Sequence, residues 1–429
     1  MGLIDRLVVI GSKLLSKIST SLGLGAGETW PGEIALSLRP LIARTLSQSF
    51  PDGVILIAGT NGKTTTSLMA KTILEGIGDS VVHNATGANL VNGIVSSCIR
   101  NSDWLGRVTA DVGVFEIDEN SLPVILRSIT PKRILILNLF RDQLDRYGEV
   151  DVIVEKWQKA LRCLPKETTV ILNSDDPGVA VLGKSVPGKI VYFGLNDPKH
   201  YLKTKEHAAD SAFCPNCGAR LSYEGVYYSH IGVWNCKRCS FTRPKPTIHT
   251  SKSPLPGLYN LYNTLAVTAL ARTLDIPDKD SSKALKDFRP AFGRQESIIL
   301  HGKTVKIFLS KNPAGFNASL RTALEMKATH LLFLLNDRIP DGRDVSWIWD
   351  VDFEMIPKNA VVWVSGDRVY DMALRVTYAD ISPKELRTEP VLEKAIEHAL
   401  NESRDTLYVL ATYSAMLDAR KILKGRKIL

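Results

Sequence analysis

The stretch VILIAGTNGKTTTSLMAKTIL, residues 54–74, constrains the fold more than any other part of the chain. An apolar run of strand length ends at Gly59, a short polar turn follows, and a helical pattern begins at Lys63. This order is that of a P-loop, in which backbone N–H groups and the start of a helix bind phosphate oxygens. The first glycine of the general P-loop pattern is absent, because Ile57 occupies its position. The expected phosphate-binding residues are Gly59, Thr60, Asn61, Gly62, Lys63, Thr64 and Thr65.

Apolar runs alternate with helical stretches along most of the chain. Over residues 47–294 this alternation predicts a doubly wound, mostly parallel sheet, and after residue 294 it predicts a second, smaller α/β domain of Rossmann type. We therefore expect a short helical N-terminal segment (1–46), a central ATP-binding domain (47–294) and a C-terminal domain (295–429). The expected strands are 54–59, 112–117, 133–139, 168–174, 189–194, 303–310, 329–336, 360–366 and 405–412. The expected helices are 63–77, 120–128, 150–163, 259–274, 316–326, 390–402 and 413–423.

The composition is that of a globular protein with a surplus of basic residues. Hydrophobic residues make up 44% of the chain and the formal net charge is +9, which suits an anionic partner such as a nucleotide, a nucleic acid or an acidic membrane surface. The apolar runs all fall short of the roughly 20 residues that span a bilayer. The N-terminal stretch GLIDRLVVIGSKLLSKIS contains Asp5, Lys13 and Lys17, which argues against a signal peptide. We expect a surface helix packed on the next domain, with an interfacial membrane helix as the alternative.

Four cysteines form two CxxC pairs inside the segment 204–248, which interrupts the α/β rhythm. The pairs are separated by 18 residues, the spacing of a zinc ribbon with four thiolate ligands. Such a closed site is structural, and cysteines used in this way indicate a reducing, cytoplasmic location. The surroundings are basic, but an insertion inside an ATP-binding domain does not favour nucleic-acid binding. The expected zinc ligands are Cys214, Cys217, Cys236 and Cys239.

The other two cysteines, Cys98 and Cys163, lie in helical patterns. Neither is preceded by the strand-to-helix turn that presents a catalytic nucleophile. A glutaminase needs an activated cysteine beside a histidine. We expect both to be buried structural thiols, so that a glutaminase activity would have to come from another chain.

The loop GTNGKTTT resembles that of the Mur ligase and folylpolyglutamate synthase superfamily, and later segments agree in the same order. In GVFEIDEN, Glu116 ends an apolar strand where the superfamily has a Mg²⁺-binding glutamate. The resemblance implies ATP and Mg²⁺, with Thr64 and Glu116 holding the metal ion. Lys63, Glu116 and Arg294 of FGRQE are the implied catalytic residues, which stabilise the charge of a transferring phosphoryl group.

GLYNLYN places Asn260 and Asn263 on one helix face, like the adenine-contacting asparagines of the superfamily. With Arg294, which the superfamily directs towards the phosphates, they complete the implied ATP site.

LNLFRDQLDRYGE, residues 137–149, resembles a further superfamily stretch, with departures. The matching residues are Asn138, Asp142, Leu144 and Asp145. Gln143 stands where most Mur ligases carry histidine. Trp157 falls where they carry a carbamylated lysine, although Lys156 and Lys159 lie beside it. These departures argue against a second metal site of the usual Mur type.

The cysteine insertion is similar to one branch of this superfamily, the ligase subunits of lipid II isoglutaminyl synthase. SLGLGAGETWPG, KNPAGFN, DGRDVSWIWDVDFE and ATYSAML also resemble that branch, so the likeness runs nearly the full length. It implies ATP-dependent amidation of the D-glutamate α-carboxyl on lipid II, at the inner face of the membrane. Ammonia would come from a GatD-type glutamine amidotransferase in a heterodimer. The alternatives are a ligase that adds a whole amino acid and a zinc-ribbon module that binds nucleic acid.

The segment NDRIPDGRDVSWIWDVDFE follows an expected strand, where sites of α/β proteins collect. In the branch, an aspartate of this region orients the histidine of the partner's Cys–His pair and so completes a triad. The matching residue is Asp344, with Asp350 as the alternative. A purely local role is also open, because Asp344 can cap the helix expected to begin at Val345.

Overall fold

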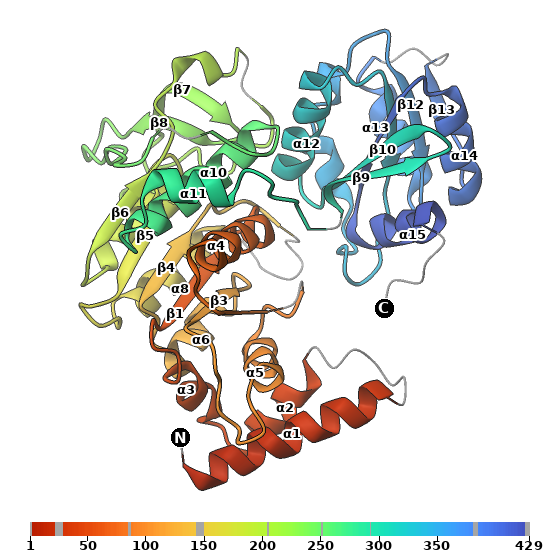
Figure 1. Ribbon diagram of the computed structural model, residues 1–429. Helices are drawn as coiled ribbons and strands as arrows, with labels where there is room; N and C mark the ends of the chain where they lie inside the picture. The colour runs from red at the N-terminus through yellow and green to blue at the C-terminus, as the bar shows by residue number, and fades with distance from the viewer. Residues whose placement is uncertain are drawn as a thin grey trace.

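The computed structural model describes residues 2–21, 29–84, 87–142, 150–203, 206–249, 252–291, 293–380 and 385–424. They form two six-stranded sheets and one two-stranded sheet, with helices on both faces of the larger sheets (Figure 1). The expected α/β class is confirmed. None of the described helices combines the length and the apolar character needed to cross a membrane.

The central sheet is wholly parallel and has the strand order β2-β3-β1-β4-β5-β6. Its strands are β1 (Val54–Ala58), β2 (Val81–His83), β3 (Val112–Glu116), β4 (Arg133–Ile136), β5 (Thr169–Asn173) and β6 (Ile190–Phe193). β1 is buried on both faces: Ile55 packs under the helices of one face, while Leu56 packs under those of the other. After β1 the chain adds β2 and β3 on one side of it and β4, β5 and β6 on the other. The carboxyl end of β1 therefore lies at a topological switch point, where α/β proteins bind ligands.

Helices cover both faces of this sheet. α4 (Lys63–Ile77), α10 (Leu258–Arg272) and α11 (Asp278–Ala284) share one hydrophobic core with it. α5 (Val91–Arg100), α6 (Leu122–Ser128) and α8 (Val150–Leu161) share the other. The N-terminal helices α1 (Leu3–Ser21), α2 (Trp30–Leu38) and α3 (Ile42–Ser47) extend that second core. Short helices follow β5 and β6: α9 (Pro177–Ala180), η1 (Val181–Ser185) and η2 (Pro198–His200).

The cysteine insertion contains an antiparallel hairpin of β7 (Ser222–Tyr228) and β8 (Ile231–Asn235). Its aromatic residues Tyr227 and Tyr228 are buried in the core that also holds α10. The hairpin is therefore packed on the central domain.

The second six-stranded sheet has the order β13-β12-β11-β14-β10-β9, parallel except for the antiparallel pair β9–β10. Its strands are β9 (Arg294–Leu300), β10 (Lys303–Leu309), β11 (His330–Leu334), β12 (Val361–Ser365), β13 (Leu386–Thr388) and β14 (Thr406–Ala411). α12 (Pro313–Glu325) and α13 (Val369–Thr377) cover one face, and α14 (Leu392–Glu402) and α15 (Tyr413–Lys424) cover the other. The short helices η3 (Ser346–Asp350) and η4 (Phe353–Met355) connect β11 to β12.

Several elements differ from the sequence expectations. β2, β9, α13 and β13 were not predicted, and two of them are only three residues long. α5 forms around Cys98, where the sequence showed a helical pattern without defined bounds. α12 begins three residues early, because the Asn312 side chain accepts a hydrogen bond from Gly315 N (2.7 Å) and caps it. The expectation that Cys163 is buried is wrong: α8 ends at Leu161, and Cys163 lies exposed in the following turn. Cys98 is buried in α5, as expected.

Candidate functional site

The phosphate loop connects β1 to α4 and is held from behind by the chain that follows β4. Asn61 N donates to Asn138 Oδ1 (2.8 Å), and Asn138 Nδ2 donates back to Asn61 O (3.0 Å). Thr60 Oγ1 accepts a hydrogen bond from Phe140 N (3.0 Å). These contacts fix the backbone so that its N–H groups and the start of α4 face a common space.

Gly62 is the residue before α4, and its φ of 90° favours glycine. A Cβ there would lie 2.2 Å from Asn263 Oδ1. Glycine at this position thus permits both the left-handed turn and the close approach of α10.

Lys63 lies over the loop in a cluster of charges. Its Nζ donates to Gly59 O (2.6 Å), Thr60 O (3.1 Å) and Glu119 Oε2 (3.2 Å). Burial alone would raise the pKa of Glu119, but Lys63 and Lys311 outweigh it and lower the pKa, so the carboxylate is ionised at neutral pH. Sequence reasoning missed Glu119, which comes three residues after the strand-end Glu116.

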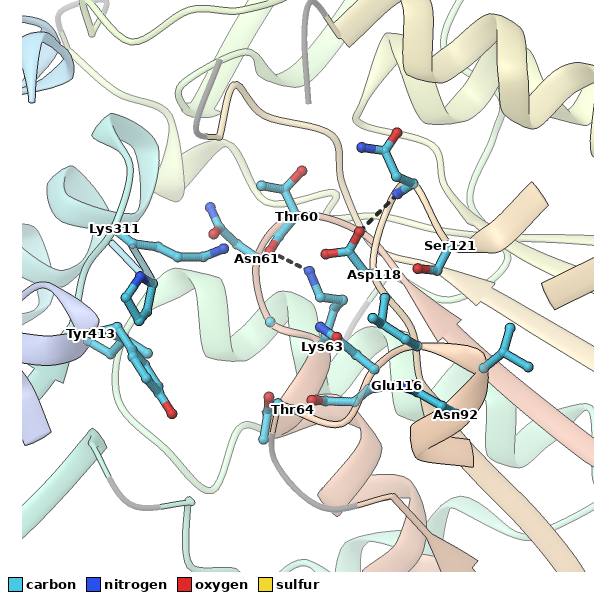
Figure 2. A pocket seen from close by; sticks show the side chains of 18 of the residues that line it. Thr60, Asn61, Lys63, Thr64, Asn92, Glu116, Asp118, Ser121, Lys311 and Tyr413 are labelled. Atoms are coloured by element: carbon cyan, nitrogen blue, oxygen red, sulfur yellow. Dashed lines mark hydrogen bonds between the residues drawn. The ribbon is translucent and has the colours of Figure 1, made fainter. Parts of the chain in front are cut away.

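Glu116 ends β3 beside the loop and is buried. Its backbone is held on both sides by Asn84, which donates to Glu116 O (2.8 Å) and accepts from Glu116 N (3.0 Å). Glu116 Oε2 is buried and has no hydrogen-bond partner among the described residues. Figure 2 shows its carboxylate close to the Thr64 hydroxyl, on the side of the cleft where Lys63 also lies. A buried carboxylate oxygen without a partner, next to a loop hydroxyl, suits a hard cation such as Mg²⁺.

Arg294 begins β9 and reaches the same region from the join of the two domains. Burial lowers the pKa of Arg294, while the nearby Glu116 acts in the opposite direction. Arg294 lines both the large cleft and a smaller cavity of about 80 Å³ behind the loop.

The two asparagines of α10 have different positions relative to that smaller cavity. Asn263 lines it together with Thr65 and Tyr259. Asn260 lies behind, accepting from Asn263 Nδ2 (3.2 Å) and donating to Pro256 O (2.8 Å). Asn263 can therefore contact a ligand in the cavity directly, whereas Asn260 orients the side chain of Asn263.

The C-terminal domain contacts the phosphate loop through residues at the start of α12. Asn312 and Asn61 exchange side-chain hydrogen bonds (3.3 and 3.1 Å). Lys311 forms an ion pair with the buried Asp142. Burial would lower the pKa of Lys311, but Asp142 and Glu119 raise it, so the ammonium is charged. Lys311 and Asn312 belong to the KNPAGFN segment, but sequence reasoning gave them no role.

Trp157 occupies the position at which the resemblance implies the superfamily's lysine. Trp157 is fully buried, and its indole Nε1 donates to Glu119 O (2.8 Å). Lys156 and Lys159 are exposed. Trp157 therefore supports the backbone of the residue that pairs with Lys63. Gln143, Leu144 and Asp145 lie outside the described residues.

A cleft of about 1130 Å³ joins these groups, larger than the roughly 300–1,000 Å³ of ordinary ligand pockets. The N-terminal segment contributes Glu33 to its wall, α5 contributes Asn92, and the C-terminal domain contributes Tyr413 and Lys311. Figure 2 shows Lys311 and Tyr413 on the wall opposite Glu116 and Asn92. The cleft has room for a nucleotide and a second substrate.

The four predicted cysteine ligands come together in the insertion. The sulfurs of Cys214, Cys217, Cys236 and Cys239 all lie within 4.8 Å of one another. Cys214 and Cys239 are 3.6 Å apart, and Cys217 and Cys236 are 3.5 Å apart. Tetrahedral Zn–S bonds of about 2.3 Å place sulfurs about 3.8 Å apart, so the cluster fits a zinc ion. Asn216 Nδ2 donates to Cys239 Sγ (3.3 Å) and lowers the pKa of that thiol to about 6, which favours the thiolate a metal needs.

The two aspartates considered for the partner's triad have different surroundings. Asp344 is exposed and accepts a hydrogen bond from Ser346 N (2.8 Å), which lowers its pKa. This contact is local, but it is not the expected cap: η3 begins at Ser346, and its N-cap residue is Val345, with no side-chain capping hydrogen bond. Asp350 instead forms an ion pair with Arg141 of the central domain (3.0 Å).

The phosphate loop, the metal-fitting glutamate and the domain arrangement define an ATP-dependent ligase of the Mur type. The Mur ligase middle domain model matches residues 57–271. Among solved structures, the chain is similar to a pseudomurein peptide ligase type C from Methanothermus fervidus (TM-score 0.64, 23% identity, 87% of this chain and 78% of that chain). It is also similar to a folylpolyglutamate synthase from Mycobacterium tuberculosis (TM-score 0.59, 15% identity, 97% of this chain and 100% of that chain). These likenesses establish the fold.

The C-terminal half gives the finer assignment. The MurT ligase C-terminal model matches residues 309–416. Two curated relatives are named lipid II isoglutaminyl synthase (glutamine-hydrolyzing) subunit MurT. The protein from Streptococcus pneumoniae strain R6 is 31% identical and covers 94% of each chain. The protein from Staphylococcus aureus strain COL is 33% identical over 86% of this chain and 87% of its own. The chain belongs to the MurT family.

Proposed function

We propose that this chain is the ATP-dependent ligase subunit of a glutamine-hydrolysing lipid II isoglutaminyl synthase. Its reaction would convert the α-carboxyl of D-glutamate in the stem peptide of lipid II to the amide. The observation that carries the proposal is that the MurT C-terminal model and the Mur ligase middle domain together match the two walls of one cleft, at residues that include Lys63, Glu116 and Lys311. Because the reaction consumes ATP and acts on a lipid-linked peptide, we place it at the cytoplasmic face of the membrane.

The chemistry follows from the charges of the cleft. A substrate carboxylate oxygen would attack the γ-phosphorus of ATP, forming an acyl phosphate as ADP leaves. Ammonia would then attack the acyl carbon and displace inorganic phosphate. Lys63, the N-terminus of α4 and Arg294 would stabilise the negative charge of the transferring group. Thr64 and Glu116 would hold Mg²⁺, which neutralises charge on the phosphates.

The cysteine cluster would bind a structural zinc ion. The four cysteine sulfurs would fill all four coordination positions of such an ion and would leave none for a substrate. The buried positions of Cys214 and Cys236 tie the ribbon to the packed part of the insertion. The zinc ion would stabilise the insertion without taking part in amide formation.

The glutaminase partner, of GatD type, would bind the face of the C-terminal domain that carries Asp344. Exposed apolar side chains occur there, with Trp349 against Tyr378 at a ring distance of 5.4 Å. Tyr370 and Leu374, one helical turn apart on α13, are also exposed. An apolar surface of this kind beside an exposed carboxylate suits a protein interface in which that carboxylate reaches into the partner's active site.

A mass-spectrometric assay tests the reaction. Lipid II would be incubated with the chain, Mg-ATP and ammonium, and separately with a GatD-type partner and glutamine. The proposal predicts conversion of one carboxyl to an amide with ammonium alone, and with glutamine only when the partner is present. ATP hydrolysis that requires a free amino acid would instead show a ligase that adds an amino acid.

Asp344→Asn tests the division of labour between the subunits. We expect loss of glutamine-driven amidation and unchanged ammonium-driven amidation, because the carboxylate would act only in the partner's triad. Asp350→Asn is the matched comparison, and a glutamine-specific loss in that variant alone would move the role to Asp350. Loss of both activities in Asp344→Asn would show a role in the ligase or in the fold.

A further inference from the structure

Helix α1 turns a mostly polar side to the protein and an apolar side to the surface. Among its residues with described side chains, the buried ones are Asp5, Val9, Ser12 and Ser16, which recur every three or four residues and so share one face. A surface helix of a globular protein ordinarily shows the reverse arrangement. The large apolar side chains are exposed instead, from 46% for Leu15 to 74% for Leu3. The exposed set is Leu3, Ile4, Leu7, Leu14, Leu15 and Ile18.

The exposed set forms one continuous stripe, here called the α1 stripe. At 3.6 residues per turn, Leu3, Leu7, Leu14 and Ile18 project in nearly the same direction, opposite the buried face. The stripe runs the length of the helix. Figure 1 shows α1 lying across the lower end of the molecule, away from the C-terminal domain.

Basic residues and a tryptophan border the α1 stripe on one side. Arg6, Lys13 and Lys17 follow the same edge of the helix at positions between the stripe and the buried face. The ammonium groups of Lys13 and Lys17 lie over the ring of Trp104, at 5.4 and 4.4 Å from its centre. Trp104 and its neighbour Leu105 are more than half exposed and widen the apolar surface.

These features together select a lipid surface among the possible occupants. An apolar stripe with a basic edge is typical of helices that lie in the plane of an anionic membrane, and tryptophan is enriched at the level of the lipid headgroups. The exposed apolar residues of the partner-binding face proposed above, such as Tyr370, lie on the C-terminal domain, at a different place in the molecule. We propose that α1 is an in-plane membrane anchor whose α1 stripe inserts into the headgroup boundary of an anionic bilayer.

The position of the anchor relates it to the cleft. α1 packs on α2, and Asp5 of α1 forms an ion pair with Arg39 just after α2 (3.0 Å). Glu33, Leu36 and Ser37 of α2 line the cleft. An anchored α1 would therefore hold the N-terminal wall of the cleft close to the membrane. This link between the anchor and the cleft rests on the proposed function, because only a lipid-linked substrate requires the cleft to lie close to the membrane.

Vesicle co-sedimentation of the full chain tests the anchor without any substrate. The vesicles would contain phosphatidylglycerol and phosphatidylcholine, with pure phosphatidylcholine for comparison. We expect binding to the anionic vesicles. The partition coefficient should decrease at least about tenfold for Leu14→Asp, since the change removes one leucine from the surface that inserts into the bilayer and adds a charge there. Lys17→Gln should weaken binding severalfold, and raised salt should do the same.

A matched control distinguishes binding through α1 from nonspecific adsorption to the vesicles. Ile299 is 78% exposed on β9 of the C-terminal domain, so Ile299→Asp adds the same charge far from α1. We expect it to bind vesicles like the unmodified chain. No binding by the unmodified chain, or equal losses in Leu14→Asp and Ile299→Asp, would overturn the proposal. A dimer that Leu14→Asp dissociates in analytical ultracentrifugation would also overturn it and assign the stripe to a second copy.

The same variants distinguish a failure of this inference from a failure of the proposed function. If Leu14→Asp loses vesicle binding, it should amidate lipid II in vesicles more slowly but amidate a soluble, lipid-free analogue at the unmodified rate. Equal rates on both substrates in a variant that no longer binds vesicles would refute the role of the anchor in substrate access. Absence of amidation by every form of the chain would instead contradict the proposed function and leave vesicle binding to be judged by itself.

Discussion

Replacing Lys311 by methionine tests the ion pair through which the C-terminal domain contacts the region of the phosphate loop. Lys311 pairs with Asp142, whose side chain is only 3% exposed. Lys311 contacts Asp142 Oδ2, and the buried Oδ1 has no hydrogen-bond partner among the described residues. Methionine keeps most of the volume of the side chain and removes the charge. The variant therefore leaves a buried carboxylate without its compensating cation.

The expected cost follows from the burial of the two groups. Removing one member of a buried ion pair costs about 3–5 kcal/mol, because the remaining charge is uncompensated. The Lys311 side chain is 30% exposed, so solvent already screens part of the attraction, and Lys63 remains near Asp142. We expect Lys311→Met to lower the free energy of unfolding by about 2 kcal/mol. The double variant Lys311→Met/Asp142→Asn should return to within about 1 kcal/mol of the unmodified chain, since no buried charge is left unpaired.

Urea unfolding at pH 7, followed by tryptophan fluorescence, measures these differences. Lys358→Met, at an exposed position, is the control for the loss of a lysine. Burial raises the pKa of Asp142, so Lys311→Met should regain stability as the pH falls and the native state takes up the proton more tightly than the unfolded chain. A Lys311→Met variant as stable as Lys358→Met, or a double variant less stable than Lys311→Met alone, would refute the reasoning.

Three further predictions concern the loop, a buried histidine and the cysteine cluster. Gly62→Ala should lower the free energy of unfolding by about 2–3 kcal/mol and raise the KM for ATP, because the Gly62 backbone is left-handed and the new Cβ displaces the Asn263 amide. An unchanged KM in a phosphate-release assay would contradict this prediction. Burial lowers the pKa of His83 to about 4. Between about pH 6.5 and pH 4 the unfolded chain therefore binds a proton on this histidine, whereas the native state leaves it neutral. Stability should then fall by at most about 3 kcal/mol between pH 6.5 and 4, and His83→Gln should flatten that part of the curve in urea titrations. A zinc chelator should lower the melting temperature by several degrees, with recovery on adding Zn²⁺, and Cys236→Ser should show no chelator effect.

The local patterns of the sequence were sufficient for most of the central sheet and its loop. β1, α4, β3 and β5 lie where apolar runs and helical spacing placed them. The phosphate loop could be predicted because its turn, glycine and lysine are consecutive in the chain. The cysteine pairs gather for a similar reason: two short turns each fix two ligands, so that one contact between the turns completes the cluster.

Short or mixed elements could not be predicted by the same means. β2 and β13 have three residues each, fewer than a period-2 pattern needs to be recognised. β9 begins with the polar residues Arg294, Gln295 and Glu296, and its strand character comes from antiparallel pairing with β10. Cys163 follows Leu161 closely enough to suggest a continuing helix, but the helix ends first and Leu164 takes the buried position.

The charge arrangement of the cleft was decided by the tertiary structure alone. Lys63 pairs with Glu119 across 56 positions of sequence, Lys311 with Asp142 across 169, and Asn61 with Asn312 across 251. Pairing at such distances depends on which loops the two sheets bring to one edge, and no local pattern encodes it.

The direction of α1 was open in the same way. Its sequence determined an amphipathic helix with an apolar face and a basic edge, because that depends only on the spacing of residues such as Leu7, Leu14 and Lys17. Which face would be buried depended on the surface that α2 and the loop carrying Trp104 present to it. The sequence thus determined the chemistry of each segment, and the tertiary structure decided which groups of separate segments meet, since burial and electrostatic pairing are properties of the assembled chain.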